Sequence, residues 1–232
     1  MEFDAVILAG GRSSRLGGAP KARFTIDGVT LLERALQAAG GARRTVVVGP
    51  GSEALPPGVL QCQEDPPFAG PAAAIAAGLA ALAGAGPAAG AAPLTLVLAC
   101  DMPLIAAAVD ALTAGLAGVQ AGTPGDVPAA GGDGVVALSA DGRLQPLAGL
   151  YGTAALQRAI DDAAGRNALE GASVLSLLAS LELRTVPVPP GSTDDVDTWE
   201  DASALGVSAP GPDRSGTARP NSTLEANGEK PG

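Results

Sequence analysis

The alternation of strand-like and helix-like segments is the feature that most constrains the fold of this chain. Short apolar runs typical of buried strands occur at residues 3–8, 45–48, 59–63, 94–100 and 184–188. Segments with helical periodicity or helix-start signals lie between or beside them, at residues 30–39, 71–83, 104–116, 153–164 and 174–181. This order predicts an α/β fold with a doubly wound, mostly parallel sheet and helices on both faces.

Two further segments complete the predicted organisation. Residues 135–139 and 144–147 flank the turn sequence Ala-Asp-Gly-Arg, which predicts a small β-hairpin. Residues 208–232 are rich in Pro, Gly, Ser and Asn and have no periodic apolar face, so we predict a disordered tail there. One folded domain over residues 1–207 remains.

Composition excludes several classes of function. The 232-residue chain has no histidine, so it lacks Ser-His-Asp and Cys-His nucleophiles and the usual Cys/His zinc site. Two cysteines cannot build a disulfide framework, and a formal net charge of -10 argues against a nucleic-acid binder. The uncharged stretch at residues 66–100 is too rich in Ala, Gly and Pro for a membrane span. The start of the chain has no basic signal-peptide region, and we predict a cytoplasmic protein.

The loop after the first strand, residues 8–21, is the most informative segment. Its four glycines stand at positions 10, 11, 17 and 18. Glycines let a backbone approach a ligand closely and point its N–H groups at anions, and Arg15 and Lys21 add cations. The spacing is not that of a P-loop, and an ordinary glycine-rich turn is the alternative. Only 2 of the 14 basic residues are lysines, which favours a specific task for the compact ammonium of Lys21, although chance is the alternative.

Asp101 directly follows the buried run at residues 94–100. In doubly wound sheets ligands bind at the carboxyl ends of the strands, and carboxylates at such places hold Mg²⁺ together with substrate phosphates. Aspartate is also a good N-cap, and a helix start at Met102-Pro103 would use it equally well. From the residues alone both interpretations stay open.

The segment Leu8-Ala-Gly-Gly-x-Ser-x-Arg-Leu-Gly…Lys21 resembles the signature of the nucleotidyltransferase superfamily. Within that superfamily the chain resembles the molybdenum cofactor guanylyltransferase family. Four further segments agree with that family in order, across about residues 4–205: Gln63-Glu-Asp65…Gly70-Pro71, Leu98-Ala-Cys-Asp101-Met-Pro103, Gln145-Pro146-Leu147 with Leu150-Tyr151, and Asp195-Val-Asp197-Thr-Trp-Glu200-Asp.

The resemblance implies a Rossmann-like nucleotidyltransferase fold over residues 1–207 and an enzyme that transfers GMP from GTP to the terminal phosphate of molybdopterin, releasing pyrophosphate. GTP, molybdopterin and other proteins of molybdenum cofactor biosynthesis are the implied partners. The implied catalytic residues are Lys21 on the α-phosphate, Arg15 on the departing pyrophosphate, and Asp101. Asp101 and Asp197 would hold Mg²⁺, with Asp194 and Asp195 as alternatives to Asp197. Acceptor binding would fall to Gln145 and Pro146, and nucleotide binding to Leu8, Ala9, Gly10, Gly11, Lys21, Asp65 (on the ribose) and Asp101.

The sequence departs from the family pattern near the nucleotide. Pro20 precedes the lysine where the family usually has an acidic residue, and Gly49-Pro50 stands where it often has an asparagine. Trp199 replaces a usual proline. Two alternatives therefore remain: a nucleotidyltransferase that uses CTP or another nucleoside triphosphate with a different small phosphate acceptor, and a non-catalytic nucleotide-binding module.

Overall fold

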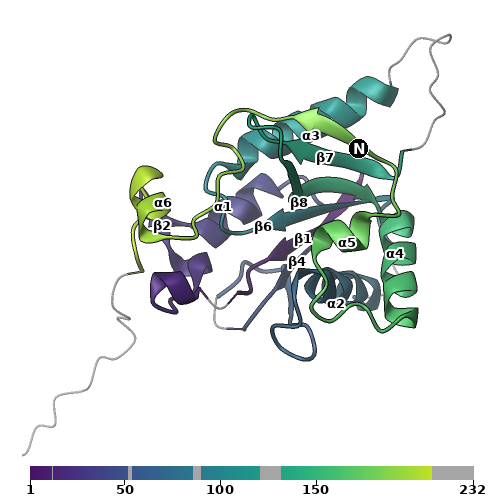
Figure 1. Cartoon of the computed structure of the whole chain (residues 1–232), viewed down its shortest axis with the longest axis horizontal. Helices are drawn as coiled ribbons and strands as arrows, with labels where there is room; N and C mark the ends of the chain where they lie inside the picture. The colour runs from purple at the N-terminus through teal and green to yellow at the C-terminus, as the bar shows by residue number, and fades with distance from the viewer. Residues whose placement is uncertain (12, 52–53, 86–89, 121–131, 211–232) are drawn as a thin grey trace, which may run out of the picture.

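The computed structural model describes residues 1–11, 13–51, 54–85, 90–120 and 132–210 (Figure 1). Its centre is a seven-stranded sheet with the order β5-β4-β1-β6-β8-β7-β9. The strands are β1 (Phe3–Leu8), β4 (Thr45–Val48), β5 (Leu60–Cys62), β6 (Leu94–Ala99), β7 (Gly134–Leu138), β8 (Leu144–Gly152) and β9 (Leu183–Pro187). β8 is antiparallel to both of its neighbours, and the other adjacent pairs are parallel. The predicted mostly parallel sheet is confirmed.

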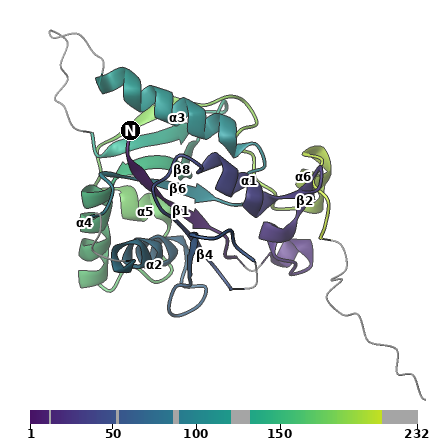
Figure 2. The same cartoon turned by 180° about the vertical axis from the view of Figure 1, so that it is seen from behind.

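Helices cover both faces of this sheet (Figures 1 and 2). They are α1 (Leu31–Ala38), α2 (Pro71–Gly84), α3 (Ile105–Gln120), α4 (Thr153–Gly165), α5 (Val174–Leu178) and α6 (Trp199–Ala204). α1 and α3 pack on one face, and α2, α4 and α5 pack on the other. None of the helices in the described part of the chain combines the length and the apolar character needed to cross a membrane.

Strand β1 is buried along its whole length because its side chains enter two cores. Ala5 and Ile7 belong to the core under α1 and α3, and Val6 and Leu8 belong to the core over α2. Alternation of side chains across a strand explains this division, and burial on both faces explains why the sequence there is a continuous apolar run. Gly78 lets α2 approach closely, because a Cβ at that position would lie 2.7 Å from Cγ1 of Val6.

The predicted start of α1 is confirmed in its local detail. The Thr30 hydroxyl accepts the N–H of Glu33 at 3.1 Å, and the Glu33 carboxylate accepts the N–H of Thr30 at 2.7 Å. This reciprocal capping box satisfies backbone donors that a helix start leaves without partners.

The predicted hairpin forms as the antiparallel pair β7–β8, with Leu138 opposite Leu144. It belongs to the main sheet, and β8 extends five residues beyond the predicted end at residue 147. The extension pairs with β6, where Leu94 lies opposite Gly152. Local sequence could not show it, because the partner that holds the extra residues lies about 50 positions away.

A small third core lies at one end of the molecule, where α6 stands beside the two-stranded sheet of β2 (Thr25–Ile26) and β3 (Val29–Thr30) (Figures 1 and 2). Ser208 exchanges two backbone hydrogen bonds with Thr25, at 2.8 and 3.0 Å. The predicted tail therefore starts too early, because Ser208 is tied to the folded chain through this bridge. The rest of the tail prediction, from residue 211 onward, lies outside the described residues.

Candidate active site

The glycine-rich loop leaves β1 at the point where the order of the sheet reverses. The Leu8 carbonyl accepts the N–H of Cys100 at 3.0 Å, and the Ala9 N–H donates to the Val48 carbonyl at 2.8 Å. These bonds hold the end of β1 between the ends of β4 and β6. Ligands of open α/β sheets bind at such a switch point, outside the carboxyl ends of the strands.

A cavity of about 500 Å³ opens at this position. It is lined by Leu8, Gly10, Gly11, Lys21, Glu64, Phe68, Gly70, Pro71, Ala74, Ala99, Cys100, Asp101, Met102, Gln145, Pro146, Leu147 and Asp195. A second cavity of about 350 Å³ adjoins it and is lined by Ala9, Gly10, Gly11, Ser13, Gly18, Pro20, Lys21, Pro50 and Phe68. Cavities of this size accommodate small-molecule ligands of nucleotide dimensions.

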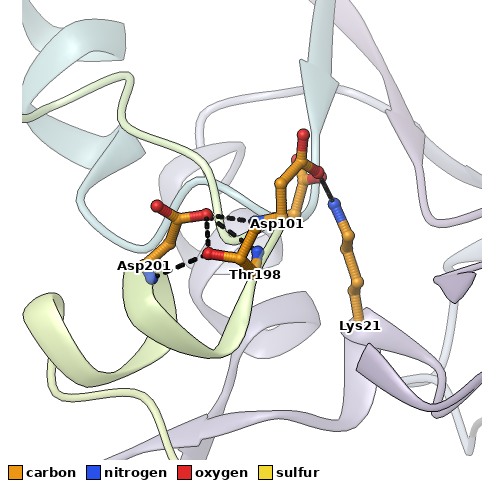
Figure 3. Close-up of polar contacts among 5 residues, drawn as sticks. Lys21, Asp101, Thr198 and Asp201 are labelled. Atoms are coloured by element: carbon orange, nitrogen blue, oxygen red, sulfur yellow. Dashed lines mark hydrogen bonds and ion pairs between the residues drawn. The ribbon is translucent and has the colours of Figure 1, made fainter. Parts of the chain in front are cut away.

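Lys21 joins the glycine-rich loop to the acidic side of the larger cavity. It begins a 3₁₀ turn, Lys21–Arg23, whose next residue, Ala22, is buried. Its Nζ lies 2.8 Å from Oδ2 of Asp101 (Figure 3). The same Nζ also forms an ion pair with Asp197. Burial alone would lower the pKa of Lys21, but the two carboxylates outweigh it and the net effect raises the pKa. Lys21 is therefore an ammonium ion at neutral pH.

A backbone hydrogen bond brings the late acidic segment to the end of β6. The Val196 N–H donates to the Asp101 carbonyl at 3.0 Å, and the Val196 side chain is fully buried in the third core. Asp195 and Asp197, on either side of Val196, are thereby held beside Asp101. The next residues form a capping box, in which Thr198 and Asp201 bond each other reciprocally and start α6 (Figure 3).

Three carboxylates in this cluster form a ligand set that fits a divalent metal. Asp101, Asp195 and Asp197 each offer an oxygen, and these oxygens lie within 4.8 Å of one another. Burial, followed by the negative charges of Asp197 and Asp101, raises the pKa of Asp195. A hard cation with oxygen ligands, such as Mg²⁺, would relieve that repulsion. Asp194, the other candidate from the sequence, is exposed and does not belong to this group of described carboxylates.

Most of the site residues suggested by the sequence meet at the two cavities. Leu8, Gly10, Gly11, Lys21, Asp101, Gln145 and Pro146 line the larger one. Ala9 lines the smaller one, and Asp197 joins through its ion pair with Lys21. Arg15 and Asp65 are exposed and line neither cavity.

Two residues that the sequence reasoning missed also line the cavity. Glu64 is only 8% exposed, and its carboxylate accepts the N–H of Phe68 at 3.0 Å. The motif comparison pointed to the neighbouring Asp65, and no local signal showed which of the two acidic side chains turns inward. Phe68 lines both cavities, and its sequence context of Pro and Gly gave no periodic pattern that would single it out.

A buried tyrosine holds in place the part of β8 that lines the larger cavity. The Tyr151 hydroxyl donates to the Pro146 carbonyl at 2.7 Å, and burial strongly raises the pKa of Tyr151. The phenol therefore stays neutral and keeps donating across the physiological pH range. This bond holds Pro146, and with it the neighbouring Gln145, at the cavity wall.

A glycine-rich loop, a lysine and a carboxylate cluster meet at the switch point of a mostly parallel sheet, an arrangement suited to a nucleoside triphosphate and a divalent metal. Residues 5–183 match the family model described as the MobA-like NTP transferase domain, and the chain belongs to this family. No curated protein sequence matches the chain significantly.

Solved structures of nucleotidyltransferases share this fold. Molybdopterin-guanine dinucleotide biosynthesis protein A from Archaeoglobus fulgidus has 18% identity and a TM-score of 0.61, over 88% of this chain and 97% of that one. The 2-C-methyl-D-erythritol 4-phosphate cytidylyltransferase from Thermus thermophilus has 21% identity and a TM-score of 0.60, over 89% and 98%. The 4-diphosphocytidyl-2C-methyl-D-erythritol synthase from Anaerococcus prevotii has 11% identity and a TM-score of 0.62, over 88% and 95%. At these identities the similarity establishes the fold.

Proposed function

We propose that this protein transfers GMP from GTP to the terminal phosphate of molybdopterin and releases pyrophosphate. The observation that carries the proposal is the pair of ion pairs that the Lys21 ammonium forms with Asp101 and Asp197, at the end of the glycine-rich loop. A cation beside a cluster of carboxylates is suited to binding a triphosphate together with a divalent metal. The sequence motifs and the fold shared with molybdopterin-guanine dinucleotide biosynthesis protein A support this choice.

The proposed reaction is a displacement at phosphorus. An oxygen of the acceptor's terminal phosphate forms a bond to the α-phosphorus, and the bond from that phosphorus to the α–β bridging oxygen breaks. Pyrophosphate leaves with the electron pair of that bond. The attacking oxygen is already anionic, so no general base is needed, which agrees with a chain that contains no histidine. The residues act by alignment and by neutralising charge.

Each charged residue has a defined part in this reaction. Lys21 would move from the carboxylates to the α-phosphate, and Arg15, on the exposed side of the same loop, would bind the departing pyrophosphate. Asp101 and Asp197, with Asp195 beside them, would hold Mg²⁺, which when bound neutralises charge on the phosphate oxygens.

The remaining predicted residues would orient the two substrates. The Leu8 carbonyl and the Ala9 N–H already take part in sheet hydrogen bonds. Gly10 and Gly11 would therefore make most of the contacts to the base. Asp65 would contact the ribose from the protein surface beside the cavities. Gln145 and Pro146 would face the acceptor. Nucleoside triphosphates as substrates agree with the expected cytoplasmic location.

A CTP-dependent transferase is the second candidate. The TM-score with the Thermus thermophilus cytidylyltransferase is 0.60, nearly the same as the 0.61 with the molybdopterin-guanine dinucleotide protein. Pro20 and Pro50, which line the smaller cavity, stand at the positions where the sequence departs from the guanylyl pattern.

Pyrophosphate release with each of the four nucleoside triphosphates, in the presence of Mg²⁺ and molybdopterin, tests both candidates. We expect release that is selective for GTP and that depends on the acceptor. A preference for CTP would replace the first candidate by the second. Binding of triphosphates without turnover under any condition would leave a nucleotide-binding module.

A further inference from the structure

Phe68 is the aromatic residue that lines both cavities, and it is 48% exposed. The chain has five aromatic residues, all within the described ranges. Phe3, Phe24 and Tyr151 are buried, and Trp199 packs against Phe24 with ring centroids 5.7 Å apart. Phe68 is thus the aromatic ring that a ligand in the site would meet.

The backbone at Phe68 adopts a conformation that aromatic residues rarely take. Its φ is +64°, in the left-handed region. Side chains with a bulky Cβ substituent cost free energy there, and such residues persist only where the surrounding structure determines them. Strain of this kind concentrates at binding sites, where neighbouring contacts hold the residue in the strained position.

Hydrogen bonds of Phe68 and of the next residue hold the backbone in this left-handed conformation. Its N–H donates to the buried Glu64 carboxylate at 3.0 Å. The next residue, Ala69, donates its N–H to the Pro66 carbonyl at 3.1 Å and accepts the Gly171 N–H at 2.7 Å. These contacts fix the backbone around Phe68. The ring therefore lines the two cavities, although burial in the core would be more favourable for an apolar side chain.

We propose that Phe68 is a stacking platform for the planar heterocycle of a bound ligand. This inference rests on the proposed nucleotide transfer, because both substrates of that reaction carry such a ring. Offset stacking on an aromatic face is favourable for any base and requires no particular hydrogen-bond pattern. The ring at the junction of the two cavities can serve either the nucleobase of the triphosphate or the heterocycle of the acceptor.

Substitutions at Phe68 in the full chain test the platform. Phe68→Asn removes the ring and tolerates the left-handed backbone, whereas Phe68→Tyr keeps the aromatic face. If the ring stacks on the nucleobase, Phe68→Asn weakens the equilibrium Kd for GTP or CTP about tenfold or more, and Phe68→Tyr leaves it nearly unchanged. If the ring stacks on the acceptor, the Kd values stay and the KM for molybdopterin rises by a similar factor.

Inorganic tripolyphosphate is the matched probe that separates stacking from a disturbed loop. It has no heterocycle, so its Kd should be the same for the wild type and for Phe68→Asn. Because asparagine relieves the backbone strain, the melting temperature of Phe68→Asn should be no lower than that of the wild type. A parallel loss of tripolyphosphate binding, or an unchanged nucleotide Kd together with an unchanged acceptor KM, overturns the proposal. A wild type that binds triphosphates without turnover counts against the proposed reaction, and the nucleotide Kd of Phe68→Asn then decides the platform by itself.

Discussion

The ammonium of Lys21 lies 2.8 Å from a carboxylate oxygen of Asp101, a residue 80 positions further along the chain. The same ammonium is paired with Asp197. The protein's own cation thus pairs with two of the three carboxylates that would bind a divalent metal. A metal at this cluster would compete with the ion pairs of Lys21, and a triphosphate that attracts the lysine would favour the metal.

Replacing Lys21 by methionine tests this competition directly. We expect Lys21→Met to bind Mn²⁺ about tenfold more tightly than the wild type in the absence of nucleotide, a change worth about 1.4 kcal/mol. Turnover should fall at the same time, because the cation for the phosphate is gone. Electron paramagnetic resonance titration of Mn²⁺ measures the affinity without any assay of activity. Equal or weaker Mn²⁺ binding by the variant would show that the lysine and the metal do not compete for the carboxylates of Asp101 and Asp197.

Lys21→Arg keeps the charge but changes its shape. The planar guanidinium has a fixed fork of donors and cannot replace a compact ammonium between two carboxylates and a phosphate. We expect a severe loss of turnover, at least about tenfold in kcat, which corresponds to about 1.4 kcal/mol of transition-state stabilisation. Steady-state pyrophosphate release is the measurement. A nearly normal rate would contradict a specific need for lysine here.

Asp101→Ala removes one carboxylate of the cluster that Asp101 forms with Asp195 and Asp197. Under the proposed mechanism several kcal/mol of charge stabilisation disappear, so we expect kcat to fall by at least about a hundredfold. Asp110→Ala, at an exposed position on α3, is the matched control and should retain activity. Retained activity in Asp101→Ala would rule out a metal role for this residue.

The contact between α2 and β1 predicts a stability effect at a single glycine. A Cβ at Gly78 would lie 2.7 Å from Val6 Cγ1 and 3.1 Å from Val48 Cγ2, so Gly78→Ala forces α2 away from the sheet. We expect a loss of about 1–3 kcal/mol of unfolding free energy, measured by chemical denaturation. Gly84→Ala at the end of the same helix meets no atom within 4 Å and should leave stability unchanged or slightly higher. Equal effects at both positions would contradict the packing argument.

The bridge between Ser208 and Thr25 predicts where the chain can be shortened. Truncation after Pro210 should keep the melting temperature and the activity of the full chain, because it leaves this bridge in place. Truncation after Val207 removes both hydrogen bonds of the bridge and should cost about 1–2 kcal/mol of stability. Thermal unfolding of the two truncated proteins makes the comparison. No difference between them would mean that the bridge contributes nothing.

Much of the fold could be predicted because its signals are local. Apolar continuity identified β1 and β4 at their observed bounds, and Thr30 and Glu33 identified the start of α1. The full length of β8 was not predictable from local signals, because its second half is held by pairing with β6. The two-residue strands β2 and β3 are too short to produce a periodic pattern.

Much the same division applies to the candidate site. The sequence by itself determined the glycine-rich loop, Lys21 and the position of Asp101 after a buried strand, because these depend on residue type and on neighbours in the chain. Only the tertiary structure decided that Glu64 rather than Asp65 lines the cavity, and that Asp195 joins Asp101 and Asp197, which the family resemblance had already paired. The position of Asp195 and Asp197 depends on the hydrogen bond from Val196 to Asp101, 95 positions apart in the chain, and on burial of Val196 in the third core against still earlier residues. Such contacts form only when the whole chain packs, and no local pattern encodes them.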